Sequence, residues 1–244
     1  MLNEYWREKV NVTNVKVKRV DKTTQTMEEK LNVLRAGVLG SNDGILTVVG
    51  VLVSVAAATT NHFTIFIAGL SDLLACAFSM AAGEYASVSA QKETEKAAVA
   101  KEAALLKTDW HGQMQAVKDF YVQRGVRADT AEAIAKDLLQ KKPLATVVRV
   151  KYDIELGHYL NPWDASFASL FSAALGGLLP LMAMTFVNGN LKWYATILAV
   201  AVTSALTGYL SAKLGDGLTR RAVIRNIIIG LITITIHYGV GKLF

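Results

Sequence analysis

Long apolar stretches separated by short polar breaks dominate the pattern of this chain. A membrane-spanning helix needs about 20 mostly apolar residues. Five stretches meet that length, at residues 33–59, 63–90, 165–187, 193–212 and 223–240. The breaks at 61–62 and 188–190 are polar and of turn type. They should therefore join spans one and two, and spans three and four, as antiparallel hairpins.

Between spans two and three the pattern changes to short amphipathic segments. Residues 93–107 are rich in strong helix formers and should continue span two without a break. Apolar spacing on one helix face predicts three further helices. The first covers residues 113–124, with Gly125 as its C-cap. The second has Asp129 or Thr130 as its N-cap and reaches about residue 140, and the third covers residues 145–158. Because each is too short to be stable alone, these helices should pack together.

The sequence therefore predicts an all-α integral membrane protein. It has five transmembrane helices and a small cytoplasmic helical bundle inserted between spans two and three. The expected parts are an N-terminal arm (1–30), spans one and two (31–90), the helical domain (91–162) and spans three to five (163–244). The composition agrees, because 52% of residues are hydrophobic and only 19% are charged, against about 25% charged in soluble domains.

The 26 Lys and Arg residues are placed very unevenly along the chain. All but Lys192 and Lys242 lie in the arm up to Arg35, in residues 91–161, or in the link at 213–225. Since such residues favour the cytoplasmic side, the N-terminus and helical domain should be cytoplasmic and the C-terminus on the far side. The net charge of +6 is then explained by the basic residues that orient the chain in the membrane. Without a basic stripe interleaved with aromatics, we expect no nucleic-acid partner.

Ionisable residues inside the spans are costly to bury and mark candidate functional positions. Asp43 lies near the middle of span one, with no basic residue in any span deep enough to pair with it. Asp72, Cys76, Met80 and Glu84 follow one another at four-residue intervals and form one stripe on span two. Carboxylate oxygen with soft sulfur suits Fe²⁺ or Mn²⁺ better than Na⁺ or Mg²⁺. Alternatively, the thiol is a small buried hydrophobe and the two acids are solvated near the interfaces.

Small residues in the first two spans suggest that these helices approach closely. They are Gly37, Gly40, Gly44, Gly69, Ala77, Ala81 and Gly83. In span three, Pro180 should kink the helix and free carbonyl groups.

Two motifs carry a resemblance to a known family. Residues 38–45, VLGSNDGI, resemble the span-one motif of the vacuolar iron transporter family, and residues 79–91, SMAAGEYASVSAQ, are similar to its span-two motif. The order of five spans with a helical insert also matches. The resemblance implies a homodimer in a membrane, with an ion path between the protomers lined by spans one and two. It also implies export of Fe²⁺ or Mn²⁺ from the cytosol in exchange for protons.

Transferred residue by residue, the resemblance implies that Asp43 and Met80 are metal ligands of this path. The remaining candidate pathway residues are Asp72, Glu84, Asn42 and Cys76. Fe²⁺ or Mn²⁺ would be the transported ion, and we expect no permanently bound cofactor. We expect no enzyme either, because the sequence lacks a Ser-His-Asp set, a phosphate-binding loop and clustered histidines.

The insert departs from the family pattern. Family members typically carry glutamates on its first two helices and a Met and Glu group near its end, which bind several metal ions. Here residues 113–116 read QMQA and 147–149 read VVR, so only Glu102 and Glu155 match as metal ligands. We expect the insert to bind metal weakly or not at all. A non-transporting membrane scaffold or sensor is the alternative function. A vacuolar membrane and a bacterial plasma membrane both agree with the topology.

Overall fold

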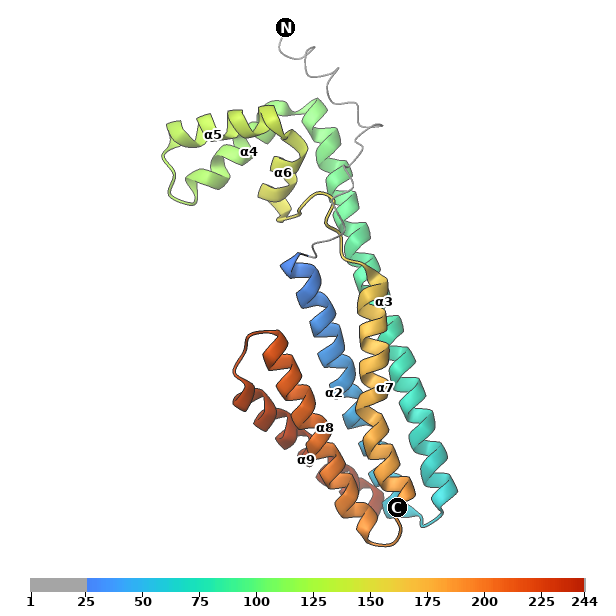
Figure 1. The fold of residues 1–244 in the computed structure, drawn as a ribbon. Coiled ribbons are helices and arrows are strands. Elements are labelled where there is room, and N and C mark those ends of the chain that lie inside the picture. The colour runs from blue at the N-terminus through green and yellow to red at the C-terminus, as the bar shows by residue number, and fades with distance from the viewer. Residues whose placement is uncertain (1–25, 244) are drawn as a thin grey trace. The chain divides into compact units, whose positions relative to one another are not determined.

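A computed structural model describes residues 26–243, and every regular element in that range is a helix (Figure 1). This confirms the all-α prediction. Residues 1–25 of the expected N-terminal arm lie outside the described residues. The helices are α2 (Met27–Ala58), α3 (His62–Thr108), α4 (Trp110–Val122), α5 (Ala128–Lys141), α6 (Pro143–Tyr152), α7 (Pro162–Phe186), α8 (Leu191–Leu214) and α9 (Thr219–Leu243).

Five of these helices, α2, α3, α7, α8 and α9, are long and apolar enough to cross a membrane. The prediction of five spans is therefore confirmed, with ends that differ by a few residues. Helix α3 has 47 residues and includes the charged segment that was expected to prolong span two. Helix α7 continues as one helix through Pro180.

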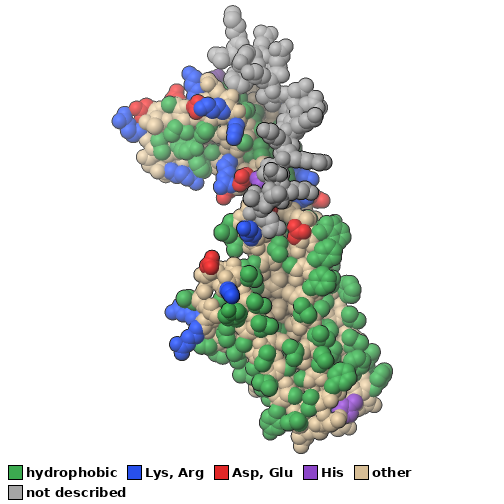
Figure 2. All heavy atoms as spheres, in the orientation of Figure 1, with side chains coloured by type: hydrophobic (Ala, Val, Ile, Leu, Met, Phe, Trp, Pro, Cys, Tyr) green, Lys and Arg blue, Asp and Glu red, His purple; other side chains and the backbone are tan. Residues whose placement is uncertain are grey.

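The chain divides into two compact units, and the division falls within α3. We call residues 89–160 the insert unit, and residues 27–88 with those from 161 onward the membrane unit. Figure 2 shows hydrophobic side chains over most of the visible face of the membrane unit, with few charged ones between them. Such a surface is suited to lipid rather than to water.

Helix α2 is the central element of the membrane unit and packs against α7, α8 and α9. One face of it is fully buried, including Ile45, Val49 and Leu52. These residues share a core with Leu181 and Met184 of α7. Burial of this face fixes the rotation of α2, and therefore the direction in which its polar residues point.

Glycines permit the close contact between α2 and α7. A Cβ atom added to Gly44 would overlap the backbone of Ala173, and one added to Gly176 would lie 2.5 Å from the Ser41 carbonyl oxygen. Gly40 likewise faces α7, where an added Cβ would be 2.6 Å from the Ser169 carbonyl oxygen.

These small residues were expected at the contact between spans one and two, and for Gly40 and Gly44 that expectation is wrong. Their neighbour is the third span. Gly69 of α3 does meet α2, at the Leu52 side chain, whereas Gly37 and Gly83 have open space where a Cβ would be. The close backbone approach is therefore between α2 and α7.

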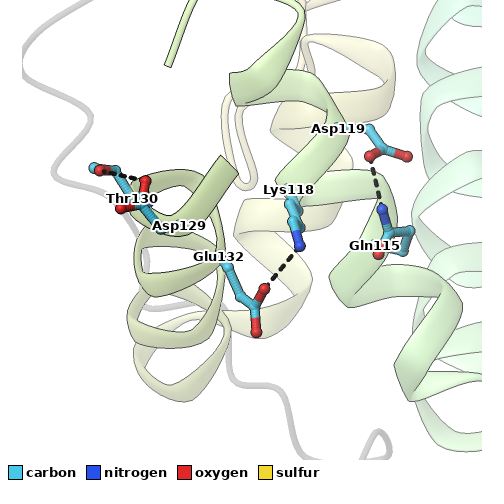
Figure 3. A network of polar contacts seen from close by, with 6 residues as sticks. All are labelled: Gln115, Lys118, Asp119, Asp129, Thr130 and Glu132. Carbon is cyan, nitrogen blue, oxygen red and sulfur yellow. Dashed lines mark hydrogen bonds and ion pairs between the residues drawn. The ribbon is translucent and has the colours of Figure 1, made fainter. Parts of the chain in front are cut away.

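In the insert unit, α4, α5 and α6 pack around the end of α3. Leu106, Val117, Ala135, Leu139 and Val147 form its apolar core. At the surface, Lys118 of α4 pairs with Glu132 of α5 at 2.7 Å (Figure 3).

Several helix ends in the insert unit differ from the expectation, three of them at a capping residue. Helix α6 ends at Tyr152 instead of 158, because Asp153 adopts a left-handed conformation and its N–H bonds back to Arg149 and Val148 carbonyls. Helix α5 begins after Arg127, so Asp129 and Thr130 lie in its first turn and do not cap it.

The second loop of the insert unit shows the third difference. Gln123, not Gly125, is the C-cap of α4, and Gly125 follows two residues later with a φ of 87°. At the other end of α4, Asp109 is an N-cap that the sequence analysis missed. Its carboxylate accepts a hydrogen bond from the Gly112 N–H at 2.9 Å.

Candidate ion pathway

The first pair of candidate pathway residues, Asp43 and Cys76, connects the first two spans. The thiol of Cys76 on α3 donates a hydrogen bond to Oδ2 of Asp43 on α2, with 3.3 Å between sulfur and oxygen. Cys76 is buried and packs with Ala77 and with Ala173 of α7, and Met80 packs against this cluster. The structure therefore brings three predicted residues, Asp43, Cys76 and Met80, to one place.

A second carboxylate and a hydroxyl lie next to this pair. Thr47, one turn after Asp43 on α2, lies beside both Asp72 and Cys76. Thr47 Oγ1 and Asp72 Oδ2 are buried, and neither has a hydrogen-bond partner of good geometry among the described residues. Buried oxygens of this kind are usually satisfied by water or an ion. Thr47 was not among the sequence-predicted residues.

Glu84, the last acid of the α3 stripe, has a different environment. It is buried, and its Oε2 lies 3.1 Å from the Arg35 guanidinium of α2. Arg35 also donates to Asn32 Oδ1 at 3.1 Å. The charge of Glu84 is therefore balanced, whereas Asp43 and Asp72 have no ion-pair partner within residues 26–243. Asn42 is half-buried on α2.

The donor groups around Asp43 and Cys76 are two carboxylates, a hydroxyl and a thiol, and the Met80 thioether lies on the adjoining Cys76 cluster. Two acids without a basic partner favour a bound cation, and in a low-dielectric site either a proton or a metal ion removes the cost of the bare charge. Oxygen with soft sulfur is the combination that suits Fe²⁺ or Mn²⁺. In the described part of a single chain, no three His, Cys, Asp or Glu side chains come together as a metal site.

Comparison with known sequences identifies the kind of protein that carries this arrangement. The sequence profile of the VIT family matches residues 34–242, which include both helices of the candidate pathway. The chain belongs to the VIT family. The resemblance drawn from residues 38–45 and 79–91 is thereby confirmed, and it places the chain among transporters rather than enzymes.

Individual members of the VIT family are similar over most of their length. The Vacuolar iron transporter of Acanthamoeba castellanii is 32% identical over 213 residues, which are 86% of this chain and 78% of the relative. Vacuolar iron transporter homolog 1 of Oryza sativa subsp. japonica is 31% identical over 215 residues, 86% and 73% of the two chains. Vacuolar iron transporter homolog 3 of Arabidopsis thaliana is 25% identical over 234 residues, 96% and 94%.

In this VIT-family chain the two predicted insert ligands lie in dissimilar environments. Glu102 is 1% exposed, and its two carboxylate oxygens accept hydrogen bonds from Lys151 Nζ and Tyr152 Oη, each at 2.8 Å. This bond raises the pKa of Tyr152, because ionising the phenol would remove the donor and place two negative charges together. Glu155 is exposed, and Nε2 of His158 lies 3.8 Å from its carboxylate.

Lys151 therefore supplies the positive charge next to the buried Glu102. This lysine and Tyr152 were not among the predicted residues, because neither belongs to a metal-binding pattern and both lie about 50 residues from Glu102 in the chain. The positions of Lys151 and Tyr152 within their own helix do not indicate that Glu102 is their partner.

Proposed function

We propose that this VIT-family protein moves Fe²⁺ or Mn²⁺ out of the cytosol in exchange for protons. The observation that carries the proposal is the Asp43–Cys76 contact, which joins a mid-span carboxylate to a sulfur-bearing helix. Three similar proteins are named vacuolar iron transporters or their homologs, which supports a divalent transition metal as the cargo.

In this mechanism Asp43 exchanges one cation for another. An arriving metal ion takes the Asp43 carboxylate, Cys76 gives up its hydrogen bond to Oδ2, and Met80 adds a soft ligand that favours Fe²⁺ over Mg²⁺ and Ca²⁺. When the metal leaves, a proton replaces it on the carboxylate. The Asp72 carboxylate of α3 and the Thr47 hydroxyl of α2 supply further oxygens next to this pair.

We further propose that the working unit is a homodimer with the path between two copies of α2 and α3. Helix α3 exposes small side chains on the face next to Met80, which would allow a second helix to approach closely. These residues are Ala75, Ser79, Ala82, Gly83 and Ala86. A second copy would double the number of donor groups along the path. The insert unit and the N-terminus would face the cytosol, as the charge pattern predicts.

A flux assay tests the proposed function. The purified protein is reconstituted into liposomes with an imposed pH gradient, and uptake of Fe²⁺, Mn²⁺, Co²⁺ and Zn²⁺ is followed together with internal pH. Asp43→Asn keeps the side-chain size and removes the exchangeable charge, so metal-driven proton flux should be lost. The matched control is Asp164→Asn, at an exposed acid in the first turn of α7. Wild-type flux in Asp43→Asn would refute the assignment.

A membrane scaffold or sensor of the same fold is the second candidate function. Two pairings favour it, because Arg35 neutralises Glu84, a candidate pathway residue, and Lys151 neutralises Glu102, a metal ligand implied by the family resemblance. No flux of any of the four metals through a folded dimer would support this candidate over transport.

A further inference from the structure

An open pocket of about 620 Å³ lies at one end of the membrane unit. The turns between α2 and α3 and between α7 and α8 border it, together with the last turns of α9. The residues that matter for its chemistry are His62, Asn190, Lys192, Trp193, Tyr238 and Lys242. It belongs to none of the features described for the ion pathway.

The pocket is positively charged. Two lysines, Lys192 and Lys242, line it, and no Asp or Glu does. Neither lysine has an ion-pair partner among residues 26–243. Lys192 is only 9% exposed, and its ammonium contacts the Trp193 ring at 5.7 Å. An ammonium on a largely buried side chain, without a counter-ion, favours a negatively charged partner, so the site is suited to an anionic ligand.

The surrounding groups favour the same kind of ligand. Asn190 is the N-cap of the 24-residue helix α8 and makes no side-chain capping bond, so the first backbone N–H groups of α8 remain without that acceptor. Helix N-termini attract phosphate and other anions. Lys242 lies 5.7 Å from the Tyr238 ring, and this ring meets Trp193 edge-on at 5.4 Å. The two aromatic side chains thus hold the lysines at the same pocket.

A second groove of about 470 Å³ adjoins this pocket and shares Asn190, Trp193 and Tyr238 with it. It runs between α8 and α9, where Ile197 and Ile234 give it an apolar lining. Helices of this length place their ends at the membrane surface, and Trp and Tyr are enriched at that level. The charged pocket thus lies at headgroup depth and the groove at the depth of the acyl chains.

We propose that this end of the protein binds an anionic phospholipid. Lys192 and Lys242 contact the phosphate, and one acyl chain lies in the groove between α8 and α9. A free phosphate ion would satisfy the lysines but leave the groove unused, so the lipid is the better match to both features. The inference does not depend on the transported metal or on transport itself.

Native mass spectrometry of the delipidated full-length protein tests the proposal. Dioleoyl phosphatidylglycerol, dioleoyl phosphatidylcholine and inorganic phosphate are titrated separately. We expect wild-type protein to bind phosphatidylglycerol about tenfold more tightly than phosphatidylcholine, and the Lys192→Gln/Lys242→Gln variant to lose that preference. The control is Lys213→Gln, at the opposite end of α8, where the lysine also contacts a tyrosine ring, Tyr209, at 5.6 Å.

The single variant Lys242→Gln guards against a folding defect, since Lys242 is exposed and its replacement leaves the core unchanged. It should weaken phosphatidylglycerol binding several-fold while the protein stays monodisperse. Unchanged lipid preference in both variants would overturn the proposal. Inorganic phosphate that binds wild type as tightly as phosphatidylglycerol would overturn the lipid assignment.

Discussion

The Cys76 thiol donates to Asp43 Oδ2 at 3.3 Å, and this hydrogen bond links the second span to the mid-membrane carboxylate of the first. The buried face of α2 fixes the position of Asp43, and the packing of Cys76 on Ala173 fixes the thiol. Two helices thus present one acid and one sulfur to each other without any basic residue between them. The predictions on transport depend on this contact.

Cys76 is the only cysteine in the chain, so a thiol reagent reports on this position without further mutagenesis. If a metal ion displaces the hydrogen bond to Asp43 and takes the sulfur, metal should protect the thiol. We expect saturating Fe²⁺ or Mn²⁺ to slow labelling by a membrane-permeant maleimide about tenfold, while Mg²⁺ leaves it unchanged, because Mg²⁺ avoids sulfur. Mass spectrometry of labelled protein gives the rate. Equal protection by Mg²⁺ would indicate a charge effect instead of ligation.

Met80 should set metal preference more than overall rate. Met80→Leu keeps the volume and the contact with the Cys76 cluster but removes the thioether. Because the thioether is a soft ligand, the variant should lose more Fe²⁺ flux than Mn²⁺ flux, by about five- to tenfold in the ratio. Met182→Leu on α7, an exposed methionine, is the matched control. An unchanged ratio in Met80→Leu would remove Met80 from the ligand set.

Lys151 should stabilise the insert unit by compensating buried Glu102. Lys151→Ala leaves a carboxylate that is 1% exposed with only the Tyr152 hydroxyl as partner. We expect a loss of about 2–3 kcal/mol of local stability, measured as faster hydrogen exchange in α6 of the full-length protein. The comparison variant is Lys141→Ala, whose pair with Asp137 is exposed on both sides and should cost less than about 1 kcal/mol. Equal exchange in the two variants would show that the Glu102 pairing is not stabilising.

The Tyr152–Glu102 hydrogen bond should make the local stability of the insert unit depend on pH. The pKa of Tyr152 is raised above the ordinary value of 10 by the bond to Glu102, so the folded state holds the phenol proton more tightly than the unfolded state. The stabilisation is complete below the ordinary pKa and is lost as pH rises through the raised one. At pH 8, Tyr152→Phe should therefore exchange faster in α6 than wild type, and the difference should shrink above pH 10. A difference that is constant with pH would exclude the phenol bond as its cause.

The helix face on which each candidate pathway residue lies can be predicted from periodicity, but the neighbouring helix that this face contacts cannot. Four-residue spacing predicts that Cys76 and Met80 share a face of the second span, and the structure places Cys76 against Asp43 and Met80 against the Cys76 cluster. The same spacing could not say that Gly40 and Gly44 face the third span. A helix pattern gives the residues on a face, but the partner depends on how all five helices fill the available space.

Pairing between distant segments was hidden for a similar reason. Arg35 and Glu84 are 49 positions apart, as are Lys151 and Glu102, and no local pattern connects them. The early end of α6 coincides with the left-handed conformation of Asp153, which Asp adopts more often than most residues other than glycine but too seldom for a sequence to predict it. Such features depend on tertiary contacts, which a single sequence does not display.

The contact between α2 and α7 gives the last prediction. Gly44→Ala would place a methyl group against the Ala173 backbone, which cannot move aside as a flexible side chain would. We expect the helices to separate, with a loss of about 1–3 kcal/mol and a lower melting temperature in detergent. The separation would also move Asp43, one residue earlier on α2, away from Cys76, so maleimide labelling of Cys76 should become faster.

Gly37→Ala, also on α2 but with open space around it, should leave both readings unchanged or raise stability slightly, since alanine favours helix. Matching behaviour of the two variants would show that the close approach of α2 and α7 does not hold the Asp43–Cys76 pair in place.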